Sequence, residues 1–81
     1  MENKVLKNAF NKIQHHYKKI YCASLTACEL LELIKIGCWL IPTCAYKLEL
    51  AKDQKAKGDC NPRWYYFHIP KTLIIGDKKH G

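Results

Sequence analysis

One short segment constrains this chain more than any other, because it carries signals for both ends of a helix. Thr26 is followed three residues later by Glu29, a spacing typical of a capping box, in which the hydroxyl and the carboxylate each accept a hydrogen bond from a backbone amide. Gly37 suits the left-handed residue that ends many helices. The sequence therefore predicts a helix from Thr26 to Ile36.

The N-terminal residues show the most regular apolar pattern. Apolar side chains recur about every 3.5 residues, the period of a helix with one buried side, at Leu6, Phe10, Ile13, Tyr17 and Ile20. We expect a helix from Asn3 to Tyr21 whose apolar side packs on the rest of the domain or pairs with a second copy. Leu6, Phe10, Ile13 and Tyr17 are therefore candidate partner or dimer contacts.

Two further elements are expected in the second half of the chain, after a short apolar link at residues 38–41. Pro42 fits the first position of a helix, and Gly58 is the next strong breaker, so we expect a helix over residues 42–57. Its inner side would hold Cys44, Ala45, Leu48 and Ala51. Aromatic and branched residues predict a strand over 63–69. A second strand or short helix is expected over 71–75.

Length and charge limit the classes of protein that this chain can belong to. Its 81 residues are enough for one small domain, divided into an N-terminal helix (1–21), a core (22–75) and a flexible tail (76–81). The net charge of +7 favours an anionic partner such as nucleic acid, an acidic protein or an anionic membrane surface. The longest apolar run, residues 30–41, contains two charged side chains and is too short to cross a bilayer. We expect a cytoplasmic protein.

Five cysteines and four histidines raise the question of metal binding or catalysis. No two cysteines have the short spacing that lets one turn direct both thiolates at a single zinc ion, so we expect core thiols, no metal site and no cofactor. The odd number of cysteines favours a reducing compartment over a disulfide framework. Without a glycine-rich phosphate loop or an evident pair of nucleophile and base, we do not expect an enzyme.

The outer side of the predicted helix over 42–57 combines side chains that suit DNA. Lysine contacts phosphate well, whereas arginine and glutamine can read base edges. Two helices followed by a strand also match the order of a winged helix-turn-helix. The candidate DNA-binding residues are Thr43, Tyr46, Lys47, Leu50, Gln54, Lys57 and Arg63.

Three segments carry a resemblance to a known family. Residues 25–33, LTACELLEL, resemble the opening helix of excisionase-type and MerR-type winged-helix domains. Residues 43–48, TCAYKL, are similar to the start of that family's second helix, and residues 63–73, RWYYFHIPKTL, to its wing strand and closing helix. The resemblance implies an α+β fold, a small winged helix-turn-helix domain to which an additional N-terminal helix is joined.

The same resemblance implies a function. Such proteins bind duplex DNA as accessory factors, often of mobile elements, and assist a larger recombination or replication enzyme. By this analogy Tyr46, Lys47, Leu50 and Gln54 would face the major groove, with Arg63 near the minor groove. The protein would act as a monomer or a homodimer.

Two alternatives remain open. The aromatic strand can serve as a stacking platform for single-stranded DNA or RNA, because every base has a face that lies well on a ring; Tyr65 and Tyr66 are the candidate stacking residues. The chain can also be a small inhibitor or adaptor of a larger enzyme, anchored by tyrosine, tryptophan and arginine. Salt-sensitive duplex binding, a preference for single strands, or a tight protein partner would distinguish the three.

Overall fold

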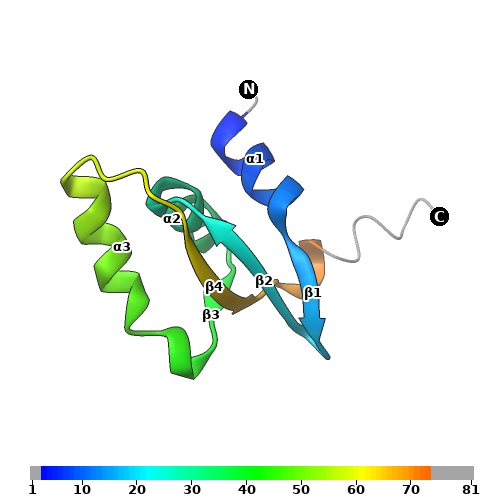
Figure 1. The fold of residues 1–81 in the computed structure, drawn as a ribbon. Helices are drawn as coiled ribbons and strands as arrows, with labels where there is room; N and C mark the ends of the chain where they lie inside the picture. The colour runs from blue at the N-terminus through cyan, green and yellow to red at the C-terminus, as the bar shows by residue number, and fades with distance from the viewer. Residues whose placement is uncertain (1–2, 74–81) are drawn as a thin grey trace.

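The strand predicted over residues 63–69 lies inside the sheet of this fold. A computed structural model describes residues 3–73, which form an α+β domain with one four-stranded antiparallel sheet in the order β1-β2-β4-β3 (Figure 1). The elements follow one another as α1 (Lys4–Lys12), β1 (Gln14–Tyr17), β2 (Ile20–Leu25), α2 (Ala27–Lys35), β3 (Trp39–Leu40), a 3-10 turn η1 (Pro42–Cys44), α3 (Lys47–Ala56) and β4 (Arg63–His68).

The predicted second helix is confirmed, and its start has the predicted capping box. The Thr26 hydroxyl accepts from the Glu29 amide at 3.2 Å, and the Glu29 carboxylate accepts from the Thr26 amide at 2.9 Å. Gly37 follows the helix with a φ of +112°, a left-handed conformation that favours glycine. Lys12 of α1 donates to both carboxylate oxygens of Glu29 at 2.8 and 2.9 Å, which fixes α1 against α2.

The prediction of one helix over residues 3–21 is wrong beyond Lys12. There the chain turns into a β1–β2 hairpin, whose turn includes Lys18 at a φ of +50°. The hairpin forms because β2 pairs with β4 along residues 21–25, and this long-range ladder outweighs the local helical period. The four candidate partner contacts therefore do not lie on one side of a single helix. Leu6 and Ile13 are partly buried against the core, whereas Phe10 and Tyr17 are exposed.

The predicted link and third helix are also corrected. Within residues 38–41 lies the edge strand β3, and the Ile41 amide extends its ladder by donating to the Tyr66 carbonyl at 3.0 Å. Pro42 has no amide to donate, so the ladder ends and the 3-10 turn η1 begins. The α-helix starts only at Lys47, and Ala45, predicted to point inward, is exposed.

The expected end of the third helix is confirmed, because Gly58 stands just beyond α3 with a φ of +73°. Past β4, residues 71–73 form a helical turn. Residues 74–75 and the tail predicted over 76–81 lie outside the described residues.

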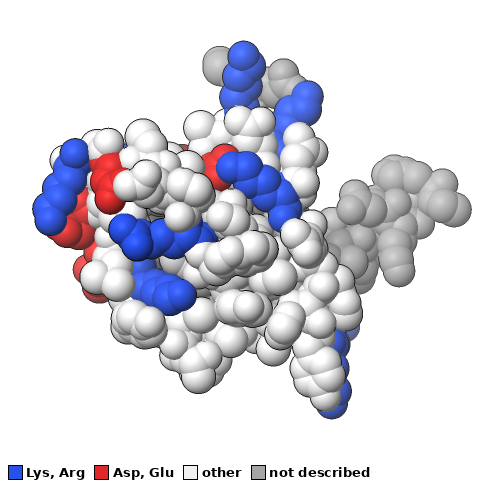
Figure 2. All heavy atoms as spheres, viewed as in Figure 1, with Lys and Arg blue, Asp and Glu red and all other residues white. Residues whose placement is uncertain are grey.

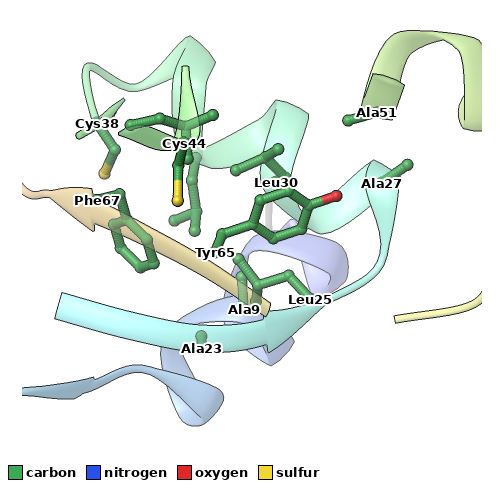
Figure 3. Packing of buried hydrophobic residues seen from close by; sticks show 12 residues of the cluster. Ala9, Ala23, Leu25, Ala27, Leu30, Cys38, Cys44, Ala51, Tyr65 and Phe67 are labelled. Carbon is green, nitrogen blue, oxygen red and sulfur yellow. The ribbon is translucent and has the colours of Figure 1, made fainter. Parts of the chain in front are cut away.

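The core lies on one face of the sheet only. Side chains alternate between the two faces of a strand, and the inward side of β4 carries Tyr65 and Phe67, each 1% exposed. Figure 3 shows both rings among residues of β2 and α2, including Leu25 and Leu30. Figure 1 shows α2 behind the sheet and α3 beside β4. Among residues 3–73, no helix packs on the opposite face of the sheet.

The cysteines follow the expectation of core thiols only in part. Cys22, Cys38 and Cys44 are buried, and burial raises the pKa of the Cys38 thiol to about 11. Cys28 and Cys60 are exposed instead. All five are free thiols.

Candidate nucleic-acid interface

The open face of the sheet carries a row of aromatic side chains. Because Tyr65 and Phe67 point inward, the alternate residues of β4 point outward. Trp39 pairs with His68 across β3 and β4, and His16 reaches the same face from β1. We call this surface the aromatic face, formed by His16, Trp39, Trp64, Tyr66 and His68.

The rings of the aromatic face contact one another across the sheet. Trp39 stacks on His68 with ring centroids 5.2 Å apart and an interplanar angle of 28°. His16 meets Tyr66 edge-on at 4.9 Å. His68 Nδ1 also lies 3.1 Å from the carbonyl oxygen of Lys19. These contacts fix four of the five rings, those of His16, Trp39, Tyr66 and His68, relative to their neighbours.

The two tryptophans are the most accessible large rings of this face. Trp39 is 52% exposed and Trp64 is 50% exposed, although both sit in a paired sheet. Tyr66 and His68 are half-buried. These are also the only two tryptophans in the chain. A large exposed apolar surface of this kind marks an interaction site more often than an accident of folding.

Positive side chains border the aromatic face. Figure 2 shows that the area over β2 and the end of β4 is uncharged, with Lys and Arg side chains beside it. Lys12 lines a shallow hollow next to Trp64, and Lys47 donates to the Trp64 carbonyl at 3.1 Å. None of the four strands contains aspartate or glutamate. A polyanion can therefore approach this face without meeting a carboxylate on the strands themselves.

A groove lies between α3 and the start of β4. The start of β4 has no β3 partner, because β3 pairs only with Phe67 and His68. This groove has a volume of about 690 Å³. Six of the seven candidate DNA-binding residues line it, namely Tyr46, Lys47, Leu50, Gln54, Lys57 and Arg63. The seventh, Thr43, is exposed on η1 and does not line it. The structure thus brings together most of the residues that the sequence singled out.

The charges inside the groove are largely neutralised. Lys57 pairs with Asp53 at 3.0 Å, and Arg63 lies 3.8 Å from Asp59. Hydrogen bonds from the Asn61 amide and from Gln54 lower the pKa of Asp59. Among residues 3–73, Lys47 has no carboxylate partner, so it is the groove cation most available to a ligand.

Two of the predicted site residues are buried. Tyr65, a candidate stacking residue, lies in the core, where burial raises the pKa of its hydroxyl. Gln54, expected on the outer side of its helix, is only 8% exposed because the loop after α3 folds back and places Asp59 on its amide. Tyr66 remains on the open face, as base stacking requires.

Sequence reasoning missed three members of the aromatic face, His16, Trp39 and His68, and it included Trp64 in the aromatic strand without choosing it as a stacking residue. The alternation in residues 63–69 already placed Trp64 and His68 beside Tyr66, so that signal was present. Trp39 and His16 belong to segments that were expected to be a link and a helix, respectively. Only the pairing of the strands brings them onto this face.

Other kinds of site find no support in residues 3–73. No group of three His, Cys, Asp or Glu side chains there is arranged to hold a metal ion. Within the same range, no helix combines the length and apolar character needed to cross a bilayer. Comparison of the chain with protein-family models, with curated proteins and with solved structures found no match.

Proposed function

We propose that this protein binds single-stranded nucleic acid on the aromatic face of its sheet. The observation that carries this proposal is the set of five rings on an open sheet face, whose strands contain no carboxylate and which lysine and arginine side chains border. In other proteins, sheets that expose aromatic side chains stack two or three unpaired bases.

The spacing of the rings suits an extended single strand of nucleic acid. Residues two apart on one strand are separated by about 6.8 Å, so Trp64, Tyr66 and His68 form a row along β4 on which successive bases can lie. Each base stacked on an aromatic side chain contributes about 1–3 kcal/mol. Because every base has such a face, this part of the interaction tolerates many sequences.

The surrounding cations supply the remaining binding energy. Lys47 lies next to Trp64, and the turn between β1 and β2 adds Lys18 and Lys19. Lysine makes phosphate contacts that position a strand without reading its bases. The affinity for single strands should therefore fall with salt, by a slope of about 0.7 for each phosphate contacted.

A salt titration with matched single strands and duplexes tests this proposal. We expect fluorescence anisotropy to show tighter binding of a single strand than of a duplex of the same length and sequence. A paired base is stacked inside the duplex and cannot lie on Trp64 or Tyr66. Equal or tighter binding of the duplex at every salt concentration would contradict the proposal.

Duplex binding is a second candidate, in which the α+β domain acts as the winged helix-turn-helix that its resemblance implies and α3 is the recognition helix. It is favoured by the groove, which gathers six of the candidate DNA-binding residues. Against it stand the burial of Gln54 and the insertion of β3 and η1 between α2 and α3. Charge reversal of Lys47 together with Arg63 should weaken duplex binding at least about tenfold if this candidate is correct.

A further inference from the structure

We infer that the groove between α3 and β4 is a nucleotide pocket that selects bases with an exocyclic amino group. This inference rests on the proposed function, because the selected nucleotide belongs to the strand that crosses the aromatic face. The observation behind it is Gln54, which is 8% exposed and lines the groove. Its Oε1 is buried and has no hydrogen-bond partner among residues 3–73.

The orientation of the Gln54 amide is set by its neighbour. Gln54 Nε2 donates to Asp59 Oδ2 at 3.2 Å, and Asp59 Oδ1 accepts from the Asn61 amide at 3.0 Å. A carboxylate only accepts hydrogen bonds, so the Nε2 side of the amide must face Asp59. Oε1 is therefore left as a buried acceptor that lacks a donor, an arrangement that a donor from a ligand would stabilise.

Gln54 Oε1 is the acceptor of the groove lining that still lacks a donor among residues 3–73. The lining also holds Lys and Arg side chains, and both of its carboxylates already have donors: Lys57 pairs with Asp53, and Asp59 accepts from Gln54. A base that presents an amino group can donate to Oε1. Uracil and thymine instead present two carbonyl oxygens on either side of one N–H, and a carbonyl oxygen in that place cannot donate to Oε1.

The rim of the groove has the other parts that a nucleotide needs. Tyr46, the residue just before α3, and Leu50, in the first turn of α3, are 65% and 52% exposed, and a base can pack against them. Lys47 connects the groove to the aromatic face, because it lines the groove while its Nζ contacts the Trp64 carbonyl. A phosphate bound by Lys47 would thus place one base near Trp64 and the next in the groove.

Oligo(dC) and oligo(dU) of about ten nucleotides form a matched pair of probes, within the usual site size for single-strand binding. Cytosine and uracil differ by an amino group in place of a carbonyl oxygen and by the proton on the adjacent ring nitrogen. At neutral pH we expect oligo(dC) to bind at least about fivefold more tightly than oligo(dU), the effect of leaving one buried polar group unpaired. The Gln54→Leu variant should remove this preference, so that the two oligonucleotides bind with nearly equal affinity.

Two further variants control the experiment. Gln14→Leu on β1 makes the same chemical change outside the groove and should leave the ratio of the two affinities unchanged. Tyr46→Ala alters an exposed side chain at the rim, so it should lower the preference without disturbing the core.

The outcomes separate this inference from the proposed function. Equal affinities of the wild-type protein for both oligonucleotides would overturn the inference and leave single-strand binding intact. A preference for oligo(dC) that survives both Gln54→Leu and Tyr46→Ala would also overturn it. Failure to bind either oligonucleotide would overturn the proposed function and the inference together.

Discussion

The two faces of the sheet are both rich in aromatic residues, but the rings of one face are buried in the core and those of the other are exposed to solvent. On β4, Tyr65 and Phe67 point inward and are each 1% exposed, whereas their neighbour Trp64 points outward and is 50% exposed. Rings on the inner face stabilise the folded state, because folding removes their apolar surface from water completely. Rings on the outer face gain much less, so their surface remains available to a ligand. One strand therefore supplies both the core and the proposed binding surface.

The largest expected effect is on the inner face. Phe67→Ala should lower the free energy of unfolding by about 3–5 kcal/mol, because it leaves a cavity beneath the helices. Chemical denaturation measures this loss. Tyr66→Ala changes the neighbouring ring on the outer face and should lower the free energy of unfolding clearly less. An equal loss of unfolding free energy in both variants would show that the two faces do not differ in burial.

The reverse contrast is expected at Trp64. Trp64→Ala should weaken the binding of a single-stranded oligonucleotide roughly tenfold, because one stacking ring is lost. The free energy of unfolding should fall by only about 1 kcal/mol or less, as for most half-exposed positions. Phe10→Ala is the control, since Phe10 is a 40% exposed ring on α1, outside the aromatic face. Unchanged affinity in Trp64→Ala would remove this ring from the binding surface.

The helical layer can be weakened without a change in the outer face. Thr26→Ala removes the hydroxyl that caps α2 and should lower the free energy of unfolding by about 1 kcal/mol. The affinity for single strands should stay the same. Thr43→Ala, an exposed threonine that caps no helix in the structure, should affect neither quantity. A loss of affinity in Thr26→Ala would show that the two layers are coupled.

The smallest effect concerns the pH dependence of the same layer. Burial of Glu29 raises its pKa, but hydrogen bonds from Lys12 and Thr26 outweigh burial, so the pKa lies below its ordinary value of 4.5. Because the folded state holds this carboxylate ionised, the stabilisation is present above pH 4.5 and is lost as the pH falls further. The difference in unfolding free energy between wild type and Glu29→Gln should narrow on acidification, by less than about 1 kcal/mol because Lys12 is solvent-accessible. A difference in unfolding free energy that grows as the pH falls would contradict the lowered pKa of Glu29.

The parts of the fold that the sequence predicted well depend on local signals. Thr26, Glu29 and Gly37 define α2 through hydrogen bonds and backbone angles within a few residues of each other. The hairpin of β1 and β2 could not be predicted in the same way, because Ile13, Tyr17 and Ile20 also fit a helical period. Its formation depends on pairing with β4, whose residues lie 38 (Leu25 to Arg63) to 46 (Tyr21 to Phe67) positions further along the chain.

The site was predictable to a similar extent. Alternation along β4 indicated which rings share a side, but only the position of the helices decides which side is buried. Tyr65 and Tyr66 are adjacent in sequence and therefore lie on opposite faces. Gln54 was expected at the surface, and its burial depends on the return of the loop that contains Asp59.

The most direct test of the central claim uses the indole N–H resonances of the two tryptophans, because Trp39 and Trp64 both lie on the aromatic face. In a nuclear magnetic resonance titration with a short single-stranded oligonucleotide, both resonances should shift progressively and saturate together. The matched duplex should leave them nearly unchanged. If both indoles stay still while the single strand binds, or if only the duplex moves them, the aromatic face is not the binding surface for single strands.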